Sequence, residues 1–365
     1  MRILHVIARM NVGGTATYLA SLISGQIQDG NEVLLVTGVV PKMEDEDPVL
    51  QKLPFTKIDS MSREISLVSD LKSRNQLRRI VEDFHPDVIH THTFKAGLLV
   101  RILKLSIPVV HTFHGHHLYD PEFGPVKRSI LNLIERRLAS KSAALITVGE
   151  RVGEELLSEG IGKRGQFYSI PPGINPLRQV AEIEVRRRHG LTGDELVVVW
   201  LGRFTRVKRP DLVVEVAKRL PKITFVMAGE GELLEVTKGA APANLICLGI
   251  QNRDEMWAIA DMALCTSDSE GMPLALIEAQ MAGVAVVSTN VGSISEIIES
   301  GVTGELVKGR AEELSEAVEM LASAPLKLKE MSKMAESRAK KLFSREVMVE
   351  KHQRLYEQVV EGMRK

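Results

Sequence analysis

The clearest structural pattern in the sequence is Met262-Ala-Leu-Cys265-Thr-Ser-Asp-Ser-Glu270-Gly-Met-Pro-Leu-Ala-Leu-Ile-Glu278-Ala-Gln-Met-Ala-Gly-Val-Ala285-Val-Val-Ser288. Short apolar runs at 262–265 and 285–288 have the length of buried strands. The apolar stretch at 273–282 between them has the length of a helix and starts with a proline, which suits a first helical turn. A strand, a helix and a second strand in this order predict a βαβ unit, whose strands lie parallel in one sheet.

The same alternation continues toward both ends of the chain. Further strands are expected at 3–8, 32–37, 88–91, 109–112, 144–148, 166–170, 196–200, 224–228, 245–248 and 304–307. Helices are expected at 16–28, 67–84, 96–105, 127–140, 150–159, 182–189, 211–220, 253–260 and 293–300, and throughout 311–365 with a break at 343–344. The sequence therefore predicts an α/β protein whose parallel sheets are covered by helices on both faces.

The alternation is interrupted at Ile170-Pro-Pro-Gly-Ile-Asn-Pro176. Prolines and a glycine in this density do not continue a helix or a central strand, so the segment is interpreted as a linker. A chain of 365 residues is long enough for two domains. We expect tandem Rossmann-like domains at 1–172 and 173–345, with ligands bound at the carboxyl ends of the strands, in a cleft between the domains.

The composition excludes several classes of protein. Lysine and arginine total 47, as do aspartate and glutamate, so no overall field attracts nucleic acid. The two cysteines are too few for a disulfide framework or a zinc site. The first nine residues lack the pattern of a signal peptide, and no run of about 18 apolar residues could span a membrane. A cytoplasmic protein is expected.

Two carboxylates, Glu270 and Glu278, are eight residues apart around a Gly-Met-Pro turn. Glu278 falls inside an apolar helix, where a carboxylate costs stability unless it accepts hydrogen bonds. Two vicinal ribose hydroxyls would satisfy it. The amides of Met272 and Leu274, near the start of the helix, could hold sugar hydroxyls or phosphate, whereas Pro273 has no amide hydrogen.

Two other loops follow strands and could hold an anion. Gly13 and Gly14 follow the first strand and precede a helix, where backbone amides can approach a phosphate. Arg203 and Lys208 follow the strand at 196–200 and could flank a diphosphate. A plain tight turn and a solvated basic loop would explain the same residues.

Seven of the ten histidines lie between His85 and His117, most densely in His111-Thr-Phe-His114-Gly-His116-His117. Neither cysteine nor carboxylate completes a zinc motif there, so no metal site is predicted. His114 is expected at the end of a strand, as a hydrogen-bonding or acid–base group, and the histidines at 85, 90 and 92 as structural or loop residues. Asp45-Glu-Asp47 formally matches a metal-binding D-x-D, but its polar, proline-flanked context indicates a solvated loop.

Six motifs in register resemble the retaining glycosyltransferases of family 4, which have the GT-B fold. They are the Gly13-Gly14 loop, His114-Gly-His116, Ile170-Pro-Pro-Gly-Ile174, Gly202-Arg-Phe-Thr-Arg-Val-Lys208, the segment from Ser267 to Glu278, and Val287-Ser-Thr-Asn-Val-Gly-Ser-Ile-Ser-Glu296. The resemblance spans nearly the whole chain. It implies that domain 1–172 binds the acceptor, that domain 173–345 binds a UDP- or GDP-sugar, and that a helix at about 346–365 packs back on the first domain.

The resemblance also assigns roles to individual residues. His114 and Glu270 would act at the donor sugar and the reacting centre. The remaining candidates would bind the donor: Gly13, Gly14, Arg203, Lys208, Met272, Leu274, Glu278 and, with 249–252 near the base, Arg253. No metal and no cofactor beyond the sugar donor is implied. Many relatives have glycine in place of Pro273 and Gly-Gly in place of Gly292-Ser293.

Alternatives remain open at this point. A nucleotide-sugar epimerase of the same fold, or a non-catalytic nucleotide-sugar-binding protein, would share these motifs. The acceptor could be a glycan, a lipid-linked molecule or a small molecule. Basic and apolar residues are mixed within 71–80 and 127–138, which would suit a weak contact with the inner face of a membrane, although packing of the apolar positions on the sheet explains the same pattern.

Overall fold

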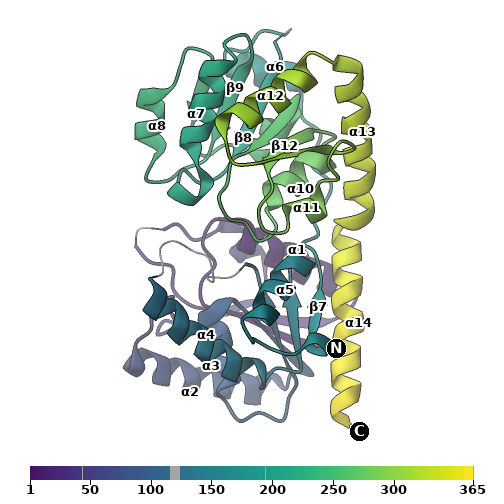
Figure 1. Cartoon of the computed structure of the whole chain (residues 1–365). Helices are drawn as coiled ribbons and strands as arrows, with labels where there is room; N and C mark the ends of the chain where they lie inside the picture. The colour runs from purple at the N-terminus through teal and green to yellow at the C-terminus, as the bar shows by residue number, and fades with distance from the viewer. Residues whose placement is uncertain (43, 116–123, 194, 365) are drawn as a thin grey trace. The chain divides into compact units, whose positions relative to one another are not determined.

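The computed structural model describes residues 1–42, 44–115, 124–193 and 195–364, which form two compact units (Figure 1). Unit 1 comprises Met1–Ile174 together with Arg345–Lys365, and unit 2 comprises Asn175–Ser344. None of the described helices is long and apolar enough to cross a membrane.

Unit 1 is built on a seven-stranded sheet with the order β3-β2-β1-β4-β5-β6-β7, and every pair of neighbours is parallel. Its strands are β1 (Arg2–Ile7), β2 (Glu32–Thr37), β3 (Phe55–Lys57), β4 (Val88–His92), β5 (Val109–Phe113), β6 (Ala144–Thr147) and β7 (Phe167–Ser169). Its helices are α1 (Gly14–Gln28), α2 (Leu67–Phe84), α3 (Thr93–Arg101), α4 (Pro125–Ala139), α5 (Glu150–Ser158) and α14 (Arg345–Arg364), with short 3-10 helices η1 (Pro48–Lys52) and η2 (Arg164–Gln166).

Side chains of β1 alternate between two apolar layers, as strand geometry requires. Ile3 and Ile7 pack in a layer with α1 and α14, whereas Leu4 and Val6 pack in a layer with α2 and α3. The first layer therefore includes the end of the chain, since α14 contacts α1 directly. His5 has the same parity as Ile3 and Ile7, which places a polar group within the α1 and α14 layer.

Unit 2 repeats the plan with a six-stranded parallel sheet in the order β10-β9-β8-β11-β12-β13. Its strands are β8 (Val197–Leu201), β9 (Thr224–Ala228), β10 (Leu245–Leu248), β11 (Met262–Cys265), β12 (Ala285–Thr289) and β13 (Gly304–Val307). Its helices are α6 (Glu182–Arg188), α7 (Pro210–Arg219), α8 (Leu234–Ala240), α9 (Arg253–Ala258), α10 (Leu274–Met281), α11 (Ile294–Ile297), α12 (Ala311–Ala322) and α13 (Pro325–Leu342), with η3 (Arg206–Lys208).

These two sheets confirm the predicted α/β class and its parallel strands. The predicted βαβ unit is β11-α10-β12, whose strands are direct neighbours. The break expected at 343–344 separates α13 from α14. The prediction missed β3 and α8. It also missed a further break at 323–324. Pro325 begins a new helix there because proline has no amide hydrogen to donate in the interior of a helix.

Candidate functional site

Each sheet has one point at which the strand order reverses, and the candidate residues follow the strands there. In unit 1 the reversal lies between β1 and β4, and in unit 2 it lies between β8 and β11. Ligands of open parallel sheets bind outside the carboxyl ends of the strands at such points. Gly13 follows β1, Arg203 follows β8 and Glu270 follows β11, so the predicted residues occupy the positions at which this topology binds ligands.

The loop that carries Arg203 lies directly against a second loop, which contains Gly229 and Gly231. A Cβ on Gly229 would lie 1.9 Å from the carbonyl oxygen of Gly202, and one on Gly231 would lie 2.5 Å from that of Phe204. Both glycines have φ near 140°, where other residues are strained. The sequence analysis missed this support, whose signal is the Ala-Gly-Glu-Gly run at the end of β9.

The two predicted cations of unit 2 have different surroundings. Arg203 is exposed, and its guanidinium has no hydrogen-bond or ion-pair partner among the residues that the structure describes. Lys208 is half-buried, and its Nζ lies 2.5 Å from Oε1 of Glu270, which also accepts a hydrogen bond from Ser267 at 2.6 Å. The hydroxyl of Thr266 donates to the Lys208 carbonyl at 2.8 Å and so joins η3 to the end of β11.

Gly292 allows the following loop to approach the Glu270 backbone. A Cβ on Gly292 would lie 1.8 Å from the Glu270 carbonyl oxygen, and its φ is 52°, so no larger residue fits without movement. The amide of Ser293 donates to the Gly271 carbonyl at 2.9 Å. The Ser293 side chain is fully buried, and its hydroxyl oxygen has no hydrogen-bond partner among the described residues. A glycine at position 293 would not bury this hydroxyl.

Helix α10 starts immediately after the Glu270 turn, with Pro273 as its N-cap residue and no side-chain cap. The first amides of a helix have no acceptor within the helix, so those beginning with Leu274 can donate to an external group. The side chains of Met272 and Leu274 are buried, which leaves the backbone as the part of this turn available to a ligand. The arrangement is that of an anion or hydroxyl site.

Glu278 lies on α10 with a side chain only 3% exposed. Its Oε1 forms an ion pair with Arg253 of α9, and its Oε2 accepts a hydrogen bond from the indole nitrogen of Trp257 at 3.4 Å. Burial raises the pKa of Glu278, and Arg253 opposes that shift. The expected cost of burying this carboxylate is therefore met within the protein, and Trp257 is a partner that the sequence analysis did not find.

The candidates in unit 1 are Gly13, Gly14 and His114. Gly13 is the N-cap residue of α1, with a φ of 150°, and Gly14 begins that helix. His114 follows β5 directly, and its Nε2 lies 3.1 Å from Nδ1 of His92. The imidazole is half-buried and contacts Tyr18 edge to face, with ring centroids 4.7 Å apart. Desolvation by burial lowers the pKa of His114 to about 4, so its ring is neutral at physiological pH.

Within unit 2, the structure joins some of the candidates directly. Lys208 contacts Glu270, and Arg253 contacts Glu278, whereas Arg203 is hydrogen-bonded to neither pair among the described residues. Two further histidines of the dense motif, at 116 and 117, lie outside the described residues. Asp47 accepts a hydrogen bond from the Val49 amide as the cap of η1, so half of the D-x-D match has a local structural role.

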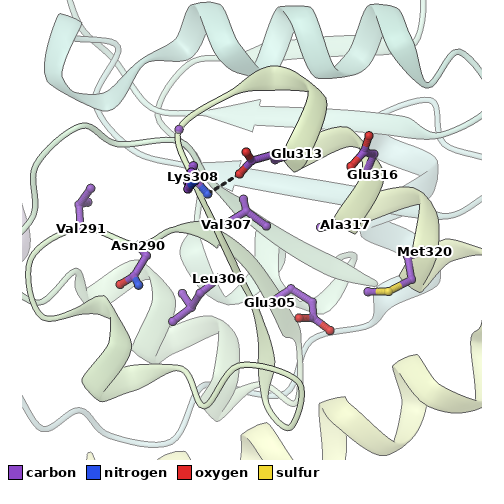
Figure 2. Close-up of a pocket in the computed structure, with 11 residues that line it drawn as sticks. Asn290, Val291, Glu305, Leu306, Val307, Lys308, Glu313, Glu316, Ala317 and Met320 are labelled. Carbon is purple, nitrogen blue, oxygen red and sulfur yellow. Dashed lines mark hydrogen bonds between the residues drawn. The ribbon is translucent and has the colours of Figure 1, made fainter.

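A recess of 760 Å³ in unit 2 contains none of the predicted residues (Figure 2). It lies between β13 and α12 and is lined by Glu305, Glu313, Glu316 and Met320, among others. The Lys308 amide donates to Glu313 at 2.8 Å at its edge. The candidate site is defined by the strand ends and not by this recess.

Two protein families match successive parts of the chain. Residues 12–178 match the family described as Glycosyltransferase Family 4, and residues 182–341 match that described as Glycosyl transferases group 1. The chain belongs to glycosyltransferase family 4. It is therefore an enzyme that transfers a sugar from a nucleotide sugar.

Individual relatives support the fold of this glycosyltransferase along its whole length. It is 28% identical, over 371 residues, to D-inositol 3-phosphate glycosyltransferase of Pseudarthrobacter chlorophenolicus, a match that covers 90% of this chain and 86% of that protein. Sucrose-phosphate synthase from Thermosynechococcus elongatus superposes with a TM-score of 0.86 at 19% identity, over 99% of this chain and all of the other. Anabaena HepE, solved with UDP and glucose, superposes with a TM-score of 0.83 at 17% identity, over 98% and 100%. These structures confirm the GT-B fold.

Proposed function

We propose that this enzyme transfers a sugar from a UDP-sugar to a hydroxyl acceptor, with retention of configuration and without a divalent metal ion. The observation that carries the proposal is the charge arrangement around the Glu270 turn. Arg203, Lys208 and the first amides of α10 together present positive charge and donors after β8 and β11. Such groups stabilise the negative charge of a leaving diphosphate, as a metal ion does in other transferases.

The carboxylates of this region support metal independence because each has a protein partner. Glu270 is paired with Lys208 and Ser267, and Glu278 with Arg253 and Trp257. Asp268 is paired with Arg209 at 3.2 Å. A divalent ion would have to displace one of these cations before it could be bound, which costs the energy of the existing pair.

The reaction that fits these groups is a same-face displacement. The bond between the anomeric carbon and the diphosphate oxygen breaks, and the nucleoside diphosphate leaves with the electron pair. The acceptor hydroxyl attacks from the same face while its proton passes to the leaving phosphate oxygen. A double displacement would need a carboxylate nucleophile, and the pairing of Glu270 with Lys208 favours the single-step route.

The choice of UDP rests on HepE, which was solved with UDP and glucose and also with UDP-glucose. The test is a panel of UDP- and GDP-sugars, first by thermal shift, because a ligand that binds the native state raises the melting temperature. Transfer to candidate hydroxyl acceptors is then measured with the donors that bind. Stabilisation by GDP-sugars alone would contradict the choice of base. Turnover of donor to an epimer without acceptor would contradict transfer as the reaction.

An exposed apolar surface on unit 1 supports an acceptor held at a membrane. On α4, Val126, Ile130 and Leu133 are 72%, 54% and 49% exposed, although Leu131 on the same helix is buried. A groove of 530 Å³ beside them is also lined by Ile65. Exposed basic residues at 127, 136 and 137 flank these positions, an arrangement that suits an anionic lipid headgroup region. We propose that unit 1 makes a weak peripheral contact there.

A further inference from the structure

The α1 and α14 layer of unit 1 contains a group of histidines that the reaction described above does not use. His5, His90 and His92 are fully buried, and their ring nitrogens lie close enough to converge on one point. Every one of these six nitrogens nevertheless has a hydrogen-bond partner within the protein. The group is therefore a closed hydrogen-bond network, and its proton positions follow from two fixed points, the Met348 carbonyl and the Gln26 side-chain amide.

The first fixed point is a backbone carbonyl of α14, which can only accept. Nδ1 of His352 lies 2.8 Å from the carbonyl oxygen of Met348 and must therefore carry a proton. Burial lowers the pKa of His352 to about 3, so the ring is neutral and its Nε2 carries only a lone pair. The hydroxyl of Tyr18, 3.0 Å away, consequently donates to that Nε2.

The proton of His90 follows from Gln26, whose side-chain nitrogen lies 3.4 Å from the Tyr356 hydroxyl and whose carbonyl oxygen lies 2.8 Å from Nε2 of His5. Tyr356 accepts from that amide, so its own proton points to Nδ1 of His90. The ring proton of His90 therefore lies on Nε2, which donates to the Thr112 hydroxyl oxygen at 2.6 Å. Burial holds the pKa of His90 well below 6.5, so the ring is neutral and Nδ1 has a lone pair. That lone pair accepts from the hydroxyl of Tyr356 at 2.6 Å.

The oxygen of Tyr356 in turn accepts from the side-chain amide of Gln26 at 3.4 Å. This contact directs the Gln26 carbonyl toward Nε2 of His5, at 2.8 Å, which must therefore carry the proton of that ring. Burial lowers the pKa of His5 to about 4, so its Nδ1 is an acceptor, and Nε2 of His92 donates to it at 3.0 Å.

His92 is neutral for the same reason, since burial lowers its pKa well below 6.5. With its proton on Nε2, His92 offers the lone pair of Nδ1 to Nε2 of His114 at 3.1 Å. We infer that this relay holds His114 as the Nε2-protonated tautomer, with Gln26 as the positioning residue, and leaves the Nδ1 lone pair of His114 to accept a hydrogen bond from a substrate hydroxyl.

Two features of the fold fit this role of His114. His114 is the half-buried last member of this hydrogen-bonded series, whose other imidazoles are fully buried. Its fixed tautomer is therefore presented at a position that a substrate can reach. The C-terminal helix α14 supplies Tyr356, which is hydrogen-bonded to both Gln26 and His90, so the end of the chain helps to set the tautomer of a residue more than 200 positions earlier. The substrate-binding part of this inference rests on the proposed function, whereas the tautomer does not.

Nuclear magnetic resonance of the full chain with nitrogen-15-labelled histidine tests the tautomer directly. Correlation of each ring nitrogen with the carbon-bound ring hydrogens distinguishes the two neutral tautomers, and the His114→Asn variant identifies the His114 signals by their loss. At neutral pH we expect His114, His92 and His5 as Nε2-protonated tautomers. His114 protonated on Nδ1 would overturn the inference. A correct tautomer in a chain without transferase activity would instead contradict only the proposed function.

The Gln26→Met variant tests whether Gln26 fixes the tautomer of His114. Methionine has a similar length but neither accepts from His5 strongly nor donates to Tyr356. The His114 nitrogen resonances should move toward each other as the two tautomers exchange, and kcat should fall while KM for the donor is unchanged. The matched control is Gln353→Met on α14, whose side chain contacts Asn31 and Glu357 but not the relay. Unchanged His114 resonances in folded Gln26→Met would refute the relay, and if this variant does not fold, the wild-type spectrum alone decides.

Discussion

Nζ of Lys208 lies 2.5 Å from Oε1 of Glu270, so the lysine that we propose to hold the donor diphosphate is paired with a carboxylate. The two residues reach each other from η3 and from the loop after β11, and Ser267 fixes the same oxygen at 2.6 Å. A diphosphate would have to share Lys208 with Glu270, and this competition can be measured.

Removal of the Lys208 charge and removal of the Glu270 charge should change UDP affinity in opposite directions. Glu270→Gln removes a competing negative charge and should tighten UDP binding, yet lower the transfer rate because the donor sugar loses a contact. Lys208→Ala should weaken UDP binding by about 1.5–3 kcal/mol, roughly ten- to a hundredfold. Isothermal titration calorimetry gives both affinities. Weaker UDP binding by Glu270→Gln would show that the two charges do not compete.

Glu278→Ala should weaken binding of the nucleoside diphosphate, whereas His114→Ala should spare it and lower the transfer rate. Loss of a charged hydrogen-bonding partner for the ribose is expected to cost about 1.5–3 kcal/mol. Arg253 and Trp257 occupy Glu278 in this structure, so part of the loss would come from their release. Calorimetry with UDP decides the matter, and equal affinities of wild type and Glu278→Ala would remove the ribose assignment.

Transfer should continue in excess EDTA. The physical reason is that Arg203, Lys208 and the amides of α10 provide the charge stabilisation that a metal ion would otherwise provide. Initial rates are measured before and after chelation, and again after magnesium or manganese is added back. A rate abolished by EDTA and restored by either ion would contradict the proposed mechanism.

Acid should destabilise unit 1 steeply. The unfolded histidines take up protons below pH 6.5, but burial keeps the pKa of His5 and His114 at about 4 and that of His352 at about 3. The unfolded state therefore binds more protons between pH 6.5 and about 4, so the free energy of unfolding falls as the pH falls through this range. Each such histidine contributes about 1.4 kcal/mol per pH unit.

Thermal melts followed by circular dichroism between neutral pH and about pH 5 measure this slope. The His352→Asn variant should reduce the slope of the free energy of unfolding against pH by the contribution of one buried histidine. The control is His85→Asn, since His85 is exposed and asparagine tolerates its left-handed backbone, with a φ of 46°. A slope that is identical in wild type and His352→Asn would disprove the assignment.

Binding to anionic vesicles should depend on the exposed apolar residues of α4. Substitution of Val126, Ile130 and Leu133 by serine should abolish co-sedimentation at low salt, because these side chains would enter the headgroup region. The control is Leu326→Ser in unit 2, a leucine that is 86% exposed but lies outside the proposed surface. If wild-type protein does not pellet with anionic vesicles even at low salt, the membrane contact is wrong and a soluble acceptor becomes the better proposal.

Local sequence was sufficient to predict where most strands and helices begin and end. Apolar runs of strand length, helical periodicity and residues such as Pro325 act on near neighbours in the chain, so most strands and helices could be placed without coordinates. The short β3 was missed because three residues, two of them exposed, carry no periodic signal. The Glu270 and Glu278 pair could also be found, because both lie in one βαβ unit.

Partners that are distant in sequence needed the tertiary structure. Trp257 reaches Glu278 from another helix, and Gly229 supports Gly202 from another strand end. Nothing in the sequence linked the histidines at 5, 90, 92 and 352 to one another, and His352 lies in the C-terminal helix α14. The βαβ alternation and the placement of charges and glycines at strand ends could be predicted from the sequence alone, because they depend on local steric and hydrophobic preferences. The buried polar groups that meet could be identified only in the folded structure, because a hydrogen-bond network depends on how strands and helices from opposite ends of the chain pack together.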